Sequence, residues 1–366
     1  MHSSDWIIIA ALSAVPVTTA LGLLIHEGGL WVLDRPLRLL LAVPIFLAFR
    51  IVGLRTETLL TAAGWSAVVF GFAAVWDISQ GFSRAVGQAG HPIVFGNTAL
   101  LMVLISLWGL LHQESIKASP RLPLLLKLGL AAGLIASLAS GSRGGWLFAL
   151  PMACYMLMTS PMRLTLSVRH LLVLSAFGVL LLVAFGPQVV ERLTPVFQGV
   201  RFALQSEAPP PAELLSIAAR VDMWREAIHA WSHAPFIGAG PERFLAALDA
   251  RAALGYMEPG RVHAHNEVLT QLAMFGLFGL AGLLLFALGL GYAFHAQQSP
   301  MARLGLVVLS TYLLFGLTDS MLSMMNRVEL YAVLLAVCAG AMRHAQLSQV
   351  SARKESQDSQ AGHCQA

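Results

Sequence analysis

The stretch "HAHNEVLTQLAMFGLFGL" (263–280) begins with two histidines and an asparagine and then turns almost wholly apolar. At the mouth of a helix, His265 could act as a general base toward a hydroxyl group, with a rate that falls below about pH 6.5, where an unperturbed histidine protonates. Asn266 could cap the helix or hold a sugar hydroxyl. The alternative is that these residues form only the solvated end of a helix.

Two arginines lie where a cation is unexpected. Arg143, in "SGSRGGWL" (140–147), lies in a tight turn whose glycines and serines let a ligand approach the backbone. Arg220 lies about 160° from Asp222 on a predicted helix, at about 100° per residue, and so on the apolar side with Trp224. A guanidinium binds phosphate through two parallel hydrogen bonds, so both arginines could bind an anion. The alternative for Arg143 is a plain turn that tolerates an arginine. The alternative for Arg220 is a side chain that reaches past the tryptophans to water.

Four histidines in or next to the long hydrophilic segment raise the hypothesis of a metal-dependent membrane hydrolase: His229, His233, His263 and His265. Against it, Ala230 occupies the position of the glutamate base in an HExxH pattern, and no carboxylate–histidine cluster replaces that pattern. We therefore expect neither a metal ion nor a cofactor. On a helix His263 and His265 would point about 200° apart, so we expect only one of them to face a given cavity.

The composition indicates a polytopic membrane protein. Of the 366 residues, 57% are hydrophobic and 11% are charged, with a mean hydropathy of +0.71, whereas a soluble domain carries about 25% charged residues. The basic residues are spread between apolar runs, which indicates a topology signal and no nucleic-acid partner. Trp6 to Ile25 has no basic leader or cleavage site and is expected to be a retained first span. The three cysteines, Cys154, Cys338 and Cys364, form no CxxC pair, and we expect no disulfide.

Apolar runs of about 17–25 residues can cross a bilayer, and we expect an all-α fold with ten such spans. They are residues 6–25, 37–54, 58–76, 92–111, 122–140, 144–161, 169–187, 267–294, 302–319 and 328–343.

The distribution of cations predicts the sidedness of the chain, since cytoplasmic loops are rich in lysine and arginine. With the N-terminus inside, the inner loops carry Arg50, Arg55, Lys117, Arg121, Lys127, Arg163, Arg169, Arg303, Arg343, Arg353 and Lys354, and the short outer loops carry Arg35, Arg38, Arg84, Arg143 and Arg327. The predicted organisation is then N-terminal spans over 1–187, an outer loop over 188–262, C-terminal spans over 263–345, and a disordered cytoplasmic tail over 346–366.

The segment "APPPAELLSIAARVDMWREAIHAWSHAPFIGAGPERF" (208–244) predicts a helix between a run of prolines and a Pro/Gly-rich turn. The expected apolar face carries Ile217, Val221, Trp224, Ile228 and Trp231. The expected polar face carries Asp222, Arg225, Glu226, His229 and His233. The Gly-Ala-Gly of "PFIGAGPERF" (235–244) lacks the Gly-Lys-Ser/Thr ending of a phosphate loop, so we predict a turn that redirects the chain toward the membrane.

Taken together, these segments resemble the O-antigen ligase and polymerase superfamily. Residues 263–280 resemble its His-Asn–apolar helix–Gly motif, residues 140–147 its Ser-Arg-Gly segment, and "RVDMWREAIHAWSHAPFIGAGPERF" its Arg…Trp…Pro-x-x-Gly-x-Gly…Phe block. "HPIVFGNTALLM" (91–102) and "DRPLRLLLAVPIF" (34–46) resemble its early segments, the latter most like the ligase branch. The family commonly has about twelve spans, so the resemblance implies about 10–12 transmembrane helices.

The resemblance implies a bacterial inner-membrane glycosyltransferase with its active site facing the periplasm. The implied donor is a glycan on undecaprenyl diphosphate, and a ligase would hand it to lipid A-core, a polymerase to another repeat unit, and a third branch to protein serine or threonine. The implied catalytic residues are His265, Arg220 and Arg143. We expect His263, Asn266, Arg84 and Arg261 to bind substrate, and membrane lipids to surround the chain.

Direct attack of the acceptor hydroxyl would invert the anomeric carbon, and a diphosphate leaving group needs charge neutralisation more than protonation. The other alternative, a flippase for lipid-linked sugars, should line its spans with inward-facing charges through the full depth of the membrane.

Overall fold

The computed structural model describes residues 2–26, 28–116, 119–160, 179, 183, 194–206, 208–322 and 325–363. Every regular element in these ranges is a helix and none is a strand, so the expected all-α fold is confirmed. Parts of the sequence analysis fall outside them, namely Lys117, Arg163, Arg169, Cys364 and most of the predicted span 169–187.

Most of the predicted spans correspond to apolar helices, which confirms a polytopic membrane protein. Among the described residues, six helices are long and apolar enough to cross a membrane: α1 (Ser3–His26), α4 (Thr56–Ser79), α5 (Pro92–Leu111), α7 (Leu122–Ser140), α12 (Glu267–His295) and the Arg327–Ala352 part of α14. Two shorter apolar helices, α8 (Trp146–Thr159) and α13 (Pro300–Phe315), occupy two further predicted spans.

The predicted span over 37–54 has a different local structure. It forms consecutive helical pieces, α2 (Asp34–Leu37), the 3₁₀ helix η2 (Arg38–Leu41) and α3 (Ala42–Val52). Pro44 has no N–H to donate to the carbonyl of Leu40, so the α-helical hydrogen-bond ladder is interrupted there.

At the other end of the chain, α14 runs from Met325 to His363, so residues 346–363 are helical where the sequence predicted a disordered tail. That segment contains no proline and has several good helix formers, and a helix that continues from a buried span carries no nucleation cost.

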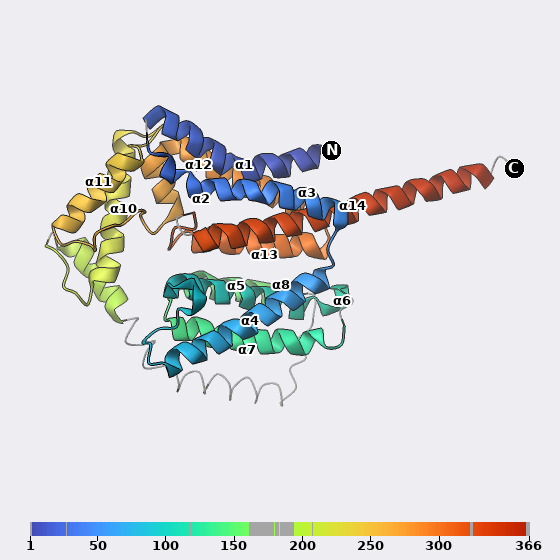
Figure 1. The fold of residues 1–366 in the computed structure, drawn as a ribbon, viewed down its shortest axis with the longest axis horizontal. Coiled ribbons are helices and arrows are strands. Elements are labelled where there is room, and N and C mark those ends of the chain that lie inside the picture. Colours follow the sequence, from blue (N-terminus) through green and yellow to red (C-terminus); the bar gives the residue numbers. More distant parts are fainter. Residues whose placement is uncertain are drawn as a thin grey trace.

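The helices form two groups (Figure 1). One contains α1, α3, α12, α13 and α14, and the other contains α4, α5, α7 and α8. Within each group small residues allow close helix packing, as is usual in membranes. A Cβ on Gly71 of α4 would lie 2.7 Å from the Cβ of Ala132 of α7, and a Cβ on Gly282 of α12 would lie 2.1 Å from the Thr18 hydroxyl of α1.

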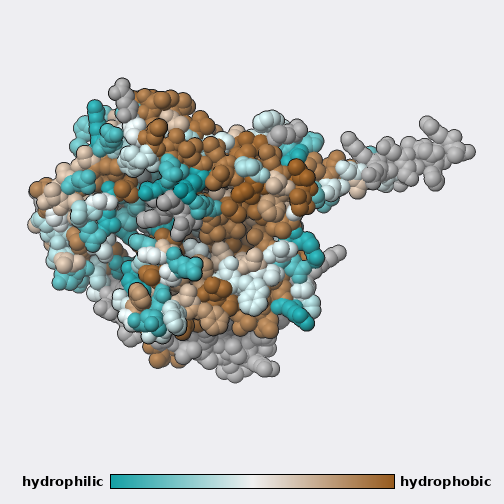
Figure 2. All heavy atoms as spheres, viewed as in Figure 1, coloured by the Kyte–Doolittle hydropathy of each residue, from teal (hydrophilic) through white to brown (hydrophobic). Residues whose placement is uncertain are grey.

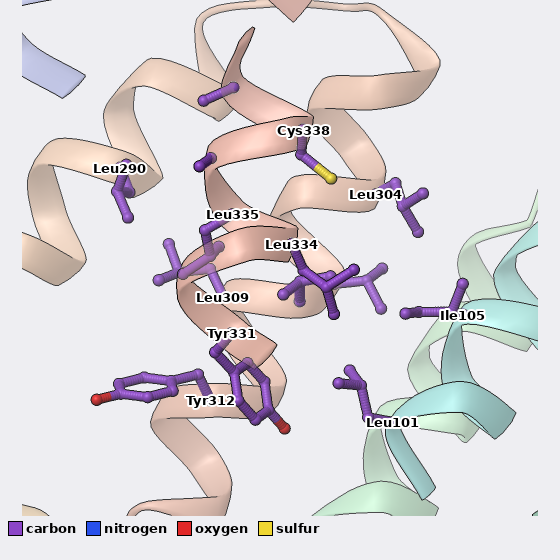
Figure 3. Close-up of a cluster of buried hydrophobic side chains, with 14 of the residues drawn as sticks. Leu101, Ile105, Leu290, Leu304, Leu309, Tyr312, Tyr331, Leu334, Leu335 and Cys338 are labelled. Atoms are coloured by element: carbon purple, nitrogen blue, oxygen red, sulfur yellow. The ribbon is translucent and has the colours of Figure 1, made fainter. Parts of the chain in front are cut away.

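An apolar core joins the two groups. Figure 3 shows Leu101 and Ile105 of α5 facing the leucines of α13 and α14. Tyr312 and Tyr331 pack edge to face below them, with their ring centroids 5.2 Å apart. On the face shown in Figure 2, hydrophobic residues cover the middle of the bundle and hydrophilic residues gather at both ends, as expected for a protein that spans a bilayer.

The hydrophilic segment 208–262 packs across one end of the bundle, where α10 (Leu215–His233) and α11 (Pro241–Ala253) lie (Figure 1). The predicted helix is present, and the turn predicted over 235–244 is present over 235–240, since α11 already begins at Pro241.

The predicted faces of α10 are partly wrong. Ile228, expected to be buried, is 49% exposed. Asp222, expected on the polar face, is buried and accepts a hydrogen bond of 2.9 Å from Nε of Arg251 on α11. The buried stripe is instead Ala219, Met223 and Ala227. Small side chains let α10 approach α11 and α12 closely, while the arginine neutralises the one carboxylate on the packed face.

Candidate active site

The segment 263–266 is an irregular approach to α12, and its geometry differs from the helical expectation. His265 has φ +50°, a left-handed conformation that non-glycine residues rarely adopt. The rings of His263 and His265 therefore do not diverge; they lie edge to face with centroids 4.4 Å apart. Both side chains are buried.

Asn266 holds this conformation in place. Its side-chain oxygen accepts a 3.0 Å hydrogen bond from the backbone N–H of Leu269, which caps α12, and its amide nitrogen donates to the carbonyl of Leu317 at 3.0 Å. The capping possibility raised from the sequence is the one the structure shows, because both polar ends of the side chain are engaged by the protein.

A carboxylate that the sequence analysis did not single out completes the histidine cluster. Asp319 follows α13, and its Oδ1 lies 3.2 Å from Nδ1 of His265. The Arg327 guanidinium forms an ion pair with Oδ2, and the backbone N–H of Ser320 donates to Oδ1 at 2.9 Å. Since the ionised carboxylate only accepts, Nδ1 of His265 carries the proton and Nε2 keeps its lone pair.

His263 has the opposite tautomer. Its Nδ1 accepts a 3.1 Å hydrogen bond from the backbone N–H of His265, so in the neutral ring the proton lies on Nε2. His263 thus offers a donor to a ligand, and His265 offers a base.

Burial keeps both rings neutral. It lowers the pKa of His263 to about 3, with the neighbouring His265 acting in the same direction. Burial also lowers the pKa of His265, although the hydrogen bond and charge of Asp319 oppose this change and Arg220 reinforces it. For Asp319 burial alone would raise the pKa, but Arg327 and His265 outweigh it, so the pKa lies well below its ordinary value.

A cavity of about 190 Å³ lies beside this cluster, and Asp319 contributes to its wall. Three of the predicted arginines line it, although they come from distant parts of the sequence: Arg84, Arg143 and Arg220. Arg84 donates from Nε to the carbonyl of Ser140 at 2.7 Å, and Arg143 lies 3.4 Å from the hydroxyl of Ser216 on α10.

Arg220 differs from the other two arginines of the cavity. Among the described residues no hydrogen bond or ion pair engages its half-buried guanidinium, and burial lowers its pKa. A desolvated cation at a cavity wall is poised to bind an anion.

The predicted substrate-binding residue Arg261 lies outside the lining of this cavity. It forms an ion pair with Glu258, and its charge contributes to lowering the pKa of His263, His265 and Arg220. Arg261 is therefore near the cluster and adds to its positive potential.

A second acidic residue fixes the turn that carries Asp319. Glu267, the first residue of α12, is buried and accepts hydrogen bonds from the Ser320 hydroxyl at 2.9 Å and the Leu322 N–H at 3.0 Å. The sequence did contain a signal for Asp319 and Arg327. An acidic residue and a basic residue lie eight positions apart in the chain, next to the last two apolar runs. Such charges at membrane depth are functional candidates by default.

The structure removes one of the two arguments by which the sequence predicted that no metal ion is bound. Among the described residues His263, His265 and Asp319 could together hold a cation, with ligand atoms within 4.8 Å of one another, so the statement that the sequence offers no carboxylate–histidine cluster was wrong. His229 and His233 are not part of this cluster; they lie exposed on α10. A cation bound at Nδ1 of His265 would have to displace its proton and would bring a second positive charge beside Arg327, which argues against a resident cation.

We therefore still predict that the activity needs no divalent metal. Purified protein in excess EDTA is expected to keep its full rate, because proton transfer and charge neutralisation both come from side chains. A rate that collapses in EDTA and returns with one particular metal would contradict this prediction.

The comparisons with known proteins agree with the geometry. An uncharacterized protein of Haemophilus influenzae is 25% identical to this chain over 275 residues, which cover 74% of this chain and 68% of that protein. Residues 128–284 match the family model described as O-antigen ligase, a range that contains Arg143, Arg220 and His265 but ends before Asp319. This part of the chain, a little over two fifths of its length, is therefore similar to the O-antigen ligase family.

Proposed function

We propose that the protein is an inner-membrane glycosyltransferase that moves O-antigen polysaccharide from undecaprenyl diphosphate to lipid A-core on the periplasmic side. One observation carries the proposal: a cavity lined by three arginines borders Asp319, and the carboxylate of Asp319 leaves His265 with a free Nε2. Cations for a diphosphate and a base for a hydroxyl are the two requirements of this transfer.

The reaction uses these groups in a single displacement. The acceptor hydroxyl gives its proton to Nε2 of His265 as its oxygen attacks the anomeric carbon. The bond from that carbon to the phosphate oxygen breaks, and its electron pair leaves with undecaprenyl diphosphate. Arg220, Arg143 and Arg84 neutralise the charge that develops on the diphosphate. Attack from the side opposite the leaving group inverts the anomeric configuration.

The arginines are predicted to act through their bidentate geometry. Arg220→Lys and Arg143→Lys keep the charge but lose the planar fork, so each is expected to lower kcat/KM at least about tenfold with normal expression. The measurement is transfer by purified protein from a lipid-linked donor. Arg225→Lys, on the exposed side of α10, is the matched control and should behave as wild type. Near wild-type transfer by both lysine variants would remove the arginines from the mechanism.

The acceptor is tested in cells that lack the protein. Under the ligase proposal, such cells lose all O-antigen-capped lipopolysaccharide while polymer stays on the lipid carrier. A single capped repeat would instead identify a polymerase, and unchanged lipopolysaccharide with loss of a protein glycan would identify the protein-directed branch.

The described charges favour transfer over flipping. Among the described residues, buried charges lie near helix ends: Asp5, in the first turn of α1, pairs with Arg343 and Arg50, and Asp319, just after α13, pairs with Arg327. A flippase would be expected to carry such groups through the full depth of its spans.

A further inference from the structure

Helix α12 is broken near its outer end. Gly276 has φ +62° and ψ −151°, so the backbone groups on either side of it cannot complete the α-helical ladder. Unpaired groups at this depth are costly, and a broken helix in a membrane protein needs partners from elsewhere in the chain.

The Pro-Phe-Ile-Gly-Ala-Gly turn between α10 and α11 supplies those partners. Its backbone forms four hydrogen bonds with α12: Ala239 N–H to Ala273 O at 2.9 Å, Gly240 N–H to Met274 O at 3.1 Å, Leu277 N–H to Pro235 O at 2.8 Å and Phe278 N–H to Phe236 O at 3.0 Å. The turn thus donates to the carbonyls before the break and accepts from the amides after it.

Only glycine fits at the two positions where the turn and α12 meet. A Cβ on Gly238 would lie 2.4 Å from the backbone nitrogen of Phe275, and a Cβ on Gly276 would lie 2.5 Å from the backbone nitrogen of Gly238. Both glycines also have positive φ. The neighbouring atoms are backbone, so they cannot move aside as the end of a side chain can.

This docking fixes α10 against α12. The turn follows α10 directly, and the buried stripe Ala219, Met223 and Ala227 packs against Ala273, Met274 and Phe275 in the same apolar cluster. Arg220 lies on α10, and His265 immediately precedes α12. The cavity that Arg220 shares with Asp319 therefore depends on how α10 is seated.

We propose that Gly238 and Gly276 are positioning residues for glycan transfer. Their contact, together with the four backbone hydrogen bonds, seats the turn on α12 and sets the Arg220 guanidinium against the His265–Asp319 pair. The proposal rests on the proposed transferase function. It assigns to the Gly-x-Gly turn and to the glycine of α12 a joint role that neither has alone.

The first test uses Gly238→Ala and Gly276→Ala. Each is expected to raise the donor KM and to lower kcat/KM by about a hundredfold, since a misplacement of about 1 Å can have this effect. The residual rate should keep an acidic limb, because His265 and Asp319 keep their contacts, and this limb should move toward higher pH, because the displaced Arg220 no longer helps to lower the pKa of His265. Gly81→Ala is the matched control: Gly81 also has positive φ (+86°), but a Cβ there meets nothing within 4 Å.

A milder variant guards against loss of folding. Nε2 of His26, at the end of α1, lies 2.7 Å from the carbonyl of Ile237 in the turn. His26→Ala removes this hydrogen bond and is expected to raise the donor KM about threefold to tenfold. His26→Gln keeps a donor and should restore most of the affinity.

The seating itself is measured without reference to activity. Spin labels at Ser232→Cys, near the end of α10, and Leu288→Cys, on α12 beyond the break, both exposed positions, report the distance between these two helices once the native cysteines are replaced by alanine. The distance distribution should broaden in both glycine variants and stay narrow in Gly81→Ala. An unchanged distribution, or a broadened one with a wild-type donor KM, would overturn the positioning role. A wild-type protein without transferase activity would overturn the proposed function alone.

Discussion

Replacement of His265 by alanine is expected to slow glycan transfer by about 10²–10⁴-fold, the usual effect of losing a positioned general base. The variant should still bind the lipid-linked donor, because the arginines of the cavity remain in place. The loss should therefore appear in kcat, with little change in donor affinity. The measurement is single-turnover transfer from pH 5 to 8, with donor binding measured in parallel.

The matched variant is His263→Ala, which should lose less. His263 carries its proton on Nε2 and cannot accept one there, and its Nδ1 only accepts the hydrogen bond from the backbone N–H of His265. Transfer by His265→Ala within a few-fold of wild type, or a failure of that variant to bind donor, would remove His265 as the base.

The pH dependence follows from the direction of the His265 pKa. Burial lowers this pKa below 6.5, so the ring stays neutral and able to accept a proton to a lower pH than an unperturbed histidine. The fall of kcat/KM on the acidic side is therefore expected below pH 6.5, the value that an unperturbed histidine would give. His263, with a pKa of about 3, does not titrate in this range.

The parts of the site that could be predicted are those with a local signal. Arg143 stands out in a glycine turn, and Arg220 stands out on a packed helix face, so both could be named as candidate anion-binding residues before any geometry was known. His265 and Asn266 are signalled by a sudden change to apolar sequence. Each of these signals lies within a few residues, where periodicity and turn chemistry are informative.

Asp319 could not be found this way because its meaning depends on distance in space. It lies 54 residues from His265, and a single carboxylate after an apolar run has no periodicity. The left-handed backbone of His265 was also invisible, since positive φ is uncommon for any residue other than glycine. Helical geometry therefore predicted that His263 and His265 point about 200° apart, whereas the fold brings their rings into contact.

The same limit applies to the fold. Hydrophobic length predicts where spans lie but not where a helix breaks, so the interruption of α12 at Gly276 and the 3₁₀ turn at Arg38–Leu41 were missed. For α10 the sequence identified the helix, but it took the large residues for the buried face. Close packing against α11 and α12 selects alanine there, and only the neighbours of the helix reveal that.

Asp319→Asn is expected to lower kcat/KM on the order of 10²–10⁴-fold while donor binding is retained. The carboxylate accepts from His265, from the Ser320 N–H and from Arg327, and an amide cannot accept from all three. If the amide NH₂ faces His265, the imidazole proton moves to Nε2 and the base is lost. If it faces Arg327, two donors oppose each other and a buried guanidinium is left without its counter-charge.

The double variant Asp319→Asn/Arg327→Met separates catalysis from folding. It removes the uncompensated charge, so it should regain thermal stability, yet it should stay as slow as the single variant because nothing fixes the His265 tautomer. Asp319 also raises the pKa of His265, so in both variants the acidic limb of the residual rate should move to lower pH. Asp249→Asn, an exposed carboxylate on α11, is the control and should match wild type. A folded Asp319→Asn protein with a normal rate would show that His265 acts without its carboxylate partner.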